Sequence, residues 1–151
     1  MLDNRKKMRC PACKNEMQKV FISKEGFDVD ICADGCGGIW FDRNELKSVD
    51  EQNEEIDEII AALDGKEFSK PTQEGRRFCP ACGTNMAKSF SSVKKEIQID
   101  ECIACGGKFL DNQELQAIRN EYSTDTERRA AMKEFVKITA EAQLMKLRKE
   151  L

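Results

Sequence analysis

The stretch Cys32-Ala33-Asp34-Gly35-Cys36-Gly37-Gly38-Ile39-Trp40-Phe41-Asp42-Arg43-Asn44-Glu45-Leu46, with the earlier Cys10-Pro11-Ala12-Cys13, decides how this chain folds. Both parts return later, the short one as Cys79-Pro80-Ala81-Cys82 and the long one as Cys102-Ile103-Ala104-Cys105-Gly106-Gly107-Lys108-Phe109-Leu110-Asp111-Asn112-Gln113-Glu114-Leu115. A self-match at a fixed offset indicates two copies of one structural unit. The sequence therefore predicts a tandem repeat.

Each copy contains three short runs typical of β-strands. They lie at 17–23, 27–32 and 38–41 in the first copy and at 90–93, 97–102 and 108–110 in the second. Asp42 and Asp111 then each precede a glutamate by three residues, Glu45 and Glu114, which is the pattern of a capping box that opens a helix. We assign these four carboxylates to helix capping rather than to catalysis, because the sequence shows no partner that would perturb their pKa.

The cysteines provide cross-links that can stabilise units too small for a large apolar core. The chain has 151 residues, eight cysteines and no histidine, and a unit of about 40 residues usually needs metal or disulfide cross-links to fold. Two knuckles per copy give two sets of four thiolates, which suit tetrahedral zinc. We predict one zinc ion on each set of metal ligands: Cys10, Cys13, Cys32 and Cys36, then Cys79, Cys82, Cys102 and Cys105.

Two other uses of these cysteines are alternatives to zinc. Iron accepts the same four thiolates in a rubredoxin-like site, but the sequence shows no second redox signature. Thiol redox catalysis favours one low-pKa pair at a helix start, whereas each Cys-x-x-Cys pair here lies in a β-rich unit with a second knuckle available. Zinc is therefore the favoured interpretation.

The same residues resemble a known family. The pattern Cys-Pro-x-Cys, a β-rich stretch, and Cys-Gly-Gly-x-aromatic-x-Asp-x-x-Glu-Leu is similar to the transcription-factor-IIB-type zinc-finger family of small zinc ribbons, over residues 10–46 and 79–115. The resemblance implies two zinc ribbons with the eight cysteines as ligands. It implies little about the biological task, because many members are known only as metal-binding domains.

One knuckle departs from the family pattern. Three residues separate Cys32 from Cys36, where the family has two, and Lys14 follows Cys13 where Gly83 follows Cys82. A larger chelate loop and a non-glycine turn both weaken a knuckle. We therefore expect the first site to release zinc more readily than the second.

Missing residue types exclude several kinds of active site. Without histidine, neither a Ser-His-Asp triad nor a histidine-rich catalytic zinc site can be built. Glycine-rich nucleotide-binding loops are also missing. The sequence contains no apolar run long enough to span a bilayer, and its first residues lack a signal core. We expect a non-enzymatic, cytoplasmic protein that does not enter the membrane.

The repeats divide the chain into four segments: ribbon one at 1–46, an acidic connector and linker at 47–75, ribbon two at 76–115, and a C-terminal helical segment at 116–151. The connector has nine acidic and three basic residues. We predict a helix there that ends near Gly65, with an apolar stripe made of Val49, Ile56, Ile59, Ile60 and Leu63. Residues 68–75, with Pro71 and Gly75, are predicted to be a flexible linker.

The segment from 125 to 151 is predicted to be one long helix opened by a third capping box, Thr124 with Glu127. Apolar residues recur at alternating spacings of four and three, and this seam consists of Ala131, Phe135, Ile138, Ala142 and Met145. We expect a second row to widen the apolar face, consisting of Val136, Ala140, Leu144, Leu147 and Leu151. The helix either packs on its own ribbons or pairs with a second copy or a partner; Phe135, Ile138 and Met145 are candidate interface residues.

Two further features bear on partners. Trp40 and Phe109 occupy matching positions, where they either fill the ribbon core or, if exposed, anchor an interface. Two basic clusters, Arg5-Lys6-Lys7 with Arg9 and Arg76-Arg77, are either solvated surface or short patches for nucleic acid. The net charge is −3, and each zinc with four thiolates adds about −2, which disfavours broad phosphate binding.

These observations combine into one interpretation. We predict a small, metal-stabilised α+β protein, with two zinc-ribbon units that carry rubredoxin-like knuckles, an acidic helical connector and a long C-terminal α-helix. The favoured function is a non-enzymatic adaptor for protein–protein interaction or self-association through the C-terminal helix. The alternatives are a nucleic-acid-binding regulator of transcription and a thiol-redox or iron protein.

Overall fold

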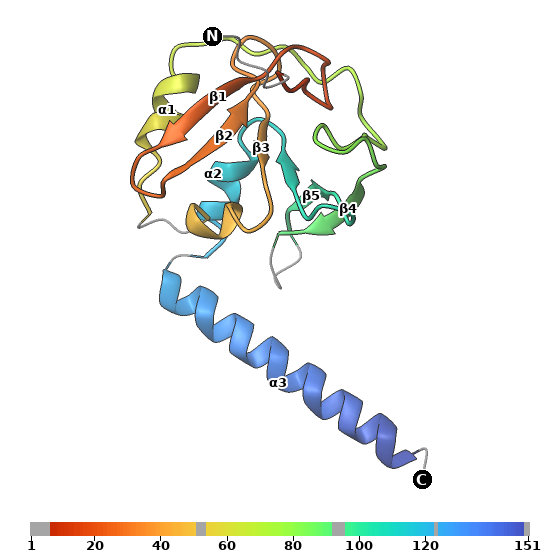
Figure 1. Cartoon of the computed structure of the whole chain (residues 1–151). Helices are drawn as coiled ribbons and strands as arrows, with labels where there is room; N and C mark the ends of the chain where they lie inside the picture. Colours follow the sequence, from red (N-terminus) through yellow and green to blue (C-terminus); the bar gives the residue numbers. More distant parts are fainter. Residues whose placement is uncertain (1–6, 51–53, 92–95, 123, 150–151) are drawn as a thin grey trace.

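The computed structural model describes residues 7–50, 54–91, 96–122 and 124–149. The two copies together build one six-stranded antiparallel sheet with the strand order β1-β2-β3-β6-β5-β4 (Figure 1). This order is a palindrome, because each copy contributes three strands and the two halves meet at their third strands.

The first half consists of β1 (Gln18–Ile22), β2 (Phe27–Ile31) and β3 (Ile39–Phe41), and the second of β4 (Ala87–Phe90), β5 (Gln98–Glu101) and β6 (Lys108–Leu110). Five of the predicted strand runs are confirmed. The run predicted at 90–93 is wrong in its bounds, because β4 ends at Phe90 and Ser91 lies in a bend, while residues 92 and 93 lie outside the described residues. Gly26 closes the β1–β2 hairpin with a φ of 76°, a conformation that favours glycine.

The two halves are joined by the pairing of β3 with β6. The register places Trp40 opposite Phe109, with Ile39 opposite Leu110. Trp40 and Phe109 are both 0% exposed, so they fill the core and are not available to anchor a partner protein. They instead form the contact between the two repeats.

Short helical segments follow the central strands. A 3-10 helix, η1 (Leu46–Ser48), comes after β3, and α2 (Glu114–Arg119) comes after β6. The connector helix α1 (Asp57–Leu63) packs against β1. It is shorter than predicted: Val49 is buried but lies outside it, and Ile60 is 53% exposed. The residues of the predicted apolar stripe therefore lie in two separate segments. At α1, only Ile56 and Ile59 of this stripe are buried.

Buried side chains form two clusters. One is mainly aliphatic and lies under ribbon one, where the connector covers it, and it includes Ile22, Ile31, Ile39, Ile59, Leu115 and Ile118. The other contains the cysteine knuckles of both copies together with Trp40 and Phe109. Because each cluster draws on both repeats, the repeats share their interior.

The segment predicted to be a flexible linker is held against the first knuckle. The backbone amides of Thr72 and Gln73 both donate to the Ala12 carbonyl, at 2.9 and 2.8 Å, and the Ser69 amide donates to the Gly35 carbonyl at 3.0 Å. Satisfied backbone hydrogen bonds fix the path of a loop. This segment therefore forms part of the covering of the first site.

The C-terminal helix α3 (Asp125–Lys149) extends away from the sheet (Figure 1). Of the two alternatives for this helix, the structure does not bear out packing on its own ribbons, because Phe135, Ile138 and Met145 are 43, 55 and 59% exposed. Among the described residues, no helix is both long and apolar enough to cross a membrane.

The two apolar rows of α3 do not form one wide face. Ala131 and Val136, the first residues of the two rows, are five positions apart, and at 3.6 residues per turn this separation turns the helix by about 140°. The row of Val136, Ala140, Leu144 and Leu147 therefore lies on the opposite side from the Phe135 seam. Leu151 lies outside the described residues.

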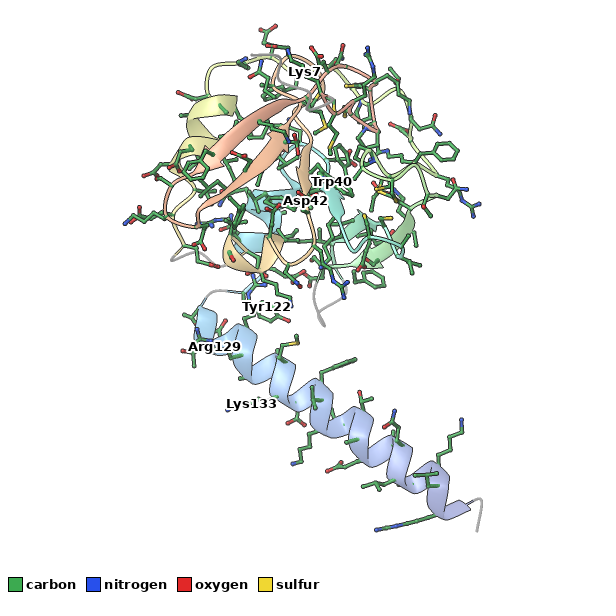
Figure 2. All side chains as sticks on the ribbon, viewed as in Figure 1. Lys7, Trp40, Asp42, Tyr122, Arg129 and Lys133 are labelled. Carbon is green, nitrogen blue, oxygen red and sulfur yellow. The ribbon has the colours of Figure 1, made fainter. Side chains whose placement is uncertain are left out.

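The first turns of α3 are fixed to the body by one arginine. Arg128 donates to the carbonyl oxygens of Ile118, at 2.8 Å, and Asp50, at 3.0 Å, and its guanidinium lies 5.3 Å from the ring centroid of Tyr122. Figure 2 shows Tyr122 at this junction, with Arg129 and Lys133 further along the helix. The helix is thus anchored at its start and exposed beyond it.

Candidate metal centres

The first centre is built by two turns that flank the β1–β2 hairpin. The Lys14 amide donates to the Cys10 carbonyl at 2.9 Å, and the Gly37 amide donates to the Cys32 carbonyl at 2.9 Å. These turns bring four sulfurs together: Cys10 and Cys36 are 3.5 Å apart, and Cys13 and Cys32 are 3.3 Å apart.

The second centre repeats this arrangement around the β4–β5 hairpin. Cys79 and Cys105 sulfurs are 3.7 Å apart, and those of Cys82 and Cys102 are 3.5 Å apart. Backbone amides also point at the sulfurs, as the Ala81 amide does at 3.4 Å from Cys79 Sγ. The structure therefore unites the eight predicted ligand residues into two sets of four.

The geometry of both sets fits a tetrahedral metal ion. In each set the sulfurs lie within 4.8 Å of one another, and a tetrahedron with metal–sulfur bonds of about 2.3 Å has edges of about 3.8 Å. Each donor set is thiolate alone, which suits zinc or iron and not a hard cation such as magnesium.

The pKa values of the cysteines show how a metal ion would be accommodated. Hydrogen bonding to Cys32 raises the pKa of the Cys10 thiol far above its usual range, and burial raises the pKa of Cys79 to about 12. Hydrogen bonding from Cys10 lowers the pKa of Cys36 to about 2, and the Thr84 hydroxyl lowers the pKa of Cys82 to about 6. Crowded thiols keep protons that a divalent cation would displace on binding.

The knuckle turns need left-handed backbone. Gly37, Gly83 and Gly106 have φ values of 78°, 80° and 82°, while Lys14 adopts 68° without being glycine. The enlarged knuckle of the first site requires glycine at position 35, because a Cβ there would lie 2.6 Å from Cys32 Sγ. The enlarged knuckle therefore folds over the sulfurs, with no room for a side chain.

Burial differs between the centres in the opposite sense to our expectation. Cys10, Cys32 and Cys36 are buried beneath the segment at 69–73, whereas Cys82 is exposed and Cys105 half-buried. A metal ion leaves an exposed site more easily than a covered one. The structure thus favours the second centre, and not the first, as the more labile of the two.

Each repeat also covers the centre of the other. A Cβ on Gly38 would lie 2.2 Å from Phe109 Cζ, and a Cβ on Gly107 would lie 2.1 Å from Trp40 Cζ2. The aromatic residue of one ribbon thus lies over the glycine of the other. Sequence reasoning missed this contact, although the repeated Gly-Gly-x-aromatic motif was its signal.

The carboxylates after the knuckles have structural roles. The Asp42 amide donates to Glu45 at 2.7 Å and the Asp111 amide to Glu114 at 2.8 Å, so half of each predicted capping box forms. The Asp42 side chain, however, accepts from Trp40 Nε1 at 3.0 Å (Figure 2) and not from a helix amide.

The second ribbon achieves the same contact with a different residue. Phe109 has no ring N–H to donate, and Arg77 instead donates to Asp111 at 2.8 Å and to Asp100 at 2.9 Å. Arg77 is 2% exposed, so it is part of neither a solvated surface nor a patch for nucleic acid. In the other basic cluster, Lys7 contacts Glu16 at 3.7 Å on the surface, and Arg5 and Lys6 lie outside the described residues.

Comparison with known proteins agrees with this geometry. A family model described as transcription factor zinc-finger, of the TFIIB zinc-ribbon type, matches residues 9–51 and 78–121. Neither the curated proteins nor the solved structures gave a match. The two matched segments each contain one complete four-cysteine centre and together span more than half of the chain, so the protein belongs to the transcription factor zinc-finger family as two tandem zinc ribbons.

Proposed function

We propose that this chain is a non-enzymatic protein-interaction module. In it, two zinc-loaded ribbons form a folded head (the described residues from 7 to 122), and α3 pairs with another helix, in a second copy or in a partner. The observation that carries the proposal is the exposure of the α3 seam on a helix anchored at one end. An apolar stripe on a helix is the surface by which helices recognise grooves and other helices.

The chemistry of the head supports a structural use of its metal ions. All eight cysteines are grouped in the two centres, which leaves no separate thiol pair for redox catalysis. The four carboxylates that follow the knuckles contact backbone amides, an indole or an arginine rather than an open site. We propose zinc as the ion, because it binds four thiolates without redox chemistry.

The test of the proposed function compares the full chain with a chain that ends at Thr124 and with the full-length variant Phe135→Asp/Ile138→Asp. We expect all three to hold two zinc ions by elemental analysis and to lack the visible absorption of iron thiolates. Only the unaltered full chain should self-associate in sedimentation or retain a partner. The proposal is wrong if both altered proteins associate like the original, or if duplex DNA binds tightly and with strong salt dependence.

A further inference from the structure

The near-twofold arrangement of the ribbons creates two equivalent clefts that differ in one respect. Each cleft lies where the knuckle of one ribbon meets the turn after the last strand of the other. The first contains Gly37, Asn112 and Gln116, and the second contains Gly106, Arg43 and Lys47. These residues occupy matching repeat positions, so the two clefts can be compared residue by residue.

The first cleft is closed on one side by this chain. Helix α1 contributes Ile56, Ile59 and Leu63 to its lining, which leaves a cavity of about 270 Å³. In the second repeat the residues that correspond to α1 lie in the first turns of α3, which extends away from the sheet (Figure 1). The second cleft, of about 400 Å³, is therefore open where the first is covered.

The residues beneath the two clefts differ in polarity between the two ribbons. Ile31 pairs with Ile39 across the strands of ribbon one, and both are buried, whereas ribbon two has Glu101 opposite Lys108 at the same register. Apolar residues at these positions suit a surface covered by a helix of the same chain. Charged residues suit a surface that meets water and a separate charged partner.

Basic residues outnumber acidic ones in the lining of the second cleft. Arg43, Lys47 and Lys108 line it together with one acid, Glu101, and none of the three basic residues has an ion-pair partner within the described part of the chain. They are not required to balance the charge of a loaded metal centre, because the first centre would carry the same charge beside Asn112, Gln116 and Ile39. Ile103, 79% exposed, adds an apolar contact at the rim.

We propose that this open cleft binds an acidic helical segment of a partner protein, in the place that α1 occupies in the other cleft. Carboxylates of the segment would pair with Arg43, Lys47 and Lys108, and an apolar side chain would pack on Ile103. Unpaired cations that line a concave surface favour such a ligand through charge-assisted hydrogen bonds. The inference rests on the proposed function for the class of partner, but it uses no residue of α3.

The probe is a labelled peptide with the sequence of residues 54–64 of this chain, which contains α1, and the receptor is the zinc-loaded full chain. We expect saturable binding in fluorescence anisotropy that weakens as salt is added. A peptide with the same apolar residues and with amides in place of all five carboxylates should bind about tenfold more weakly. Equal binding of the two peptides would overturn the proposal.

Variants locate the binding site. Lys47→Gln/Lys108→Gln should weaken binding about tenfold, whereas Lys133→Gln/Lys137→Gln, which changes the net charge equally on α3, should alter it less than about twofold. Arg43 is left in place because its side chain packs on Gly106. The proposal is wrong if the cleft variant binds like the original, or if an oligothymidylate binds more tightly than the peptide through the same lysines.

A further pair of measurements separates this inference from the proposed function. Phe135→Asp/Ile138→Asp should retain peptide binding while losing self-association or partner capture. Lys47→Gln/Lys108→Gln should lose peptide binding while retaining self-association or partner capture. If the α3 variant retains association but the cleft variant loses peptide binding, the proposed role of α3 fails and the acidic-peptide site stands.

Discussion

At the scale of single residues, this protein depends on side chains that contact the other repeat. The aromatic rings of Trp40 and Phe109 occupy the space above Gly107 and Gly38, and these glycines have ordinary negative φ values, so their small size and not their backbone freedom is what the fold requires. Tight packing of this kind leaves no room for one added methyl group.

Gly38→Ala and Gly107→Ala should each destabilise the zinc-loaded protein by about 1–3 kcal/mol, the usual cost of overpacking a core. Chemical denaturation followed by circular dichroism measures the change. Phe109→Leu should recover part of the loss in Gly38→Ala but none of it in Gly107→Ala, because only Gly38 lies under Phe109. Equal recovery in both would contradict the reciprocal contact.

Arg77 and Arg76 are neighbours in the sequence with opposite roles in the structure. Arg77→Ala should cost about 3 kcal/mol, the lower end of the range for a broken buried ion pair, because the buried carboxylate of Asp100 loses the guanidinium and keeps only Lys88, whose Nζ lies 2.7 Å from Asp100 Oδ1. Arg76→Ala is the matched control, since Arg76 is exposed, and it should change the free energy of unfolding by less than about 0.5 kcal/mol. Similar losses for the two variants would refute the assignment.

Glu114 should make stability depend on pH. Burial raises its pKa to about 7 from the ordinary 4.5, so folding favours the protonated carboxyl. The contribution of the protonated Glu114 carboxyl to the free energy of unfolding is complete below the pKa that this group has in the unfolded chain, and it is lost as pH rises through about 7. The unfolding free energy of the zinc-loaded protein should therefore fall between about pH 5 and about pH 8. We expect this fall to be less steep in Glu114→Gln than in the original protein.

Glu45→Gln is the control for this effect. Burial also raises the pKa of Glu45, but less than it raises the pKa of Glu114. We expect a smaller change of slope for this variant than for Glu114→Gln. Identical pH profiles for Glu114→Gln and the original protein would show that Glu114 does not titrate in this range.

At the scale of elements, corresponding segments of the two repeats take different paths. The residues after η1 return to β1 as α1, and the segment at 69–73 then covers the first knuckle. The corresponding residues after α2 continue into α3 and leave the second knuckle uncovered. The surfaces beneath differ in the same sense: Ile31 and Ile39 in ribbon one offer an apolar surface, and Glu101 and Lys108 in ribbon two do not.

Zinc should therefore leave the second centre first. In competition with a chromophoric chelator, we expect two phases, of which the faster belongs to the centre with the exposed Cys82. Cys82→Ser should remove the fast phase, and Cys13→Ser should remove the slow one. If Cys13→Ser removes the fast phase, the enlarged knuckle and not burial decides lability.

At the scale of the whole molecule, the palindromic sheet makes one folding unit out of two ribbons. β3 and β6 pair along their full length, and the cysteine cluster includes Trp40 and Phe109 from the two repeats. A metal ion that orders one knuckle thereby also orders the aromatic residue that covers the other. Metal binding and folding are linked in such small domains. Here we expect metal binding in one repeat to stabilise the folding of the other repeat as well.

The double variant Cys82→Ser/Cys102→Ser should therefore weaken zinc binding at the intact first centre by about tenfold or more. Trp40, buried in the unaltered protein, should shift its fluorescence emission to longer wavelength. Zinc titration and emission spectra measure the two effects. Unchanged affinity together with unchanged emission would mean that the ribbons fold independently.

The sequence by itself determined the local units, and the tertiary structure decided how they combine. The cysteine spacing, the hairpins and the start of the long helix follow from residues close together in the chain, so the repeat was sufficient to predict the eight ligands and five of the six strands in full. The interpretations of Trp40, Phe109 and Arg77 depended on the meeting of β3 and β6, which unites distant residues. The paths of α1 and α3 likewise depended on Ile39 and Lys108, whose effect appears only once a helix has a surface to cover or to leave open.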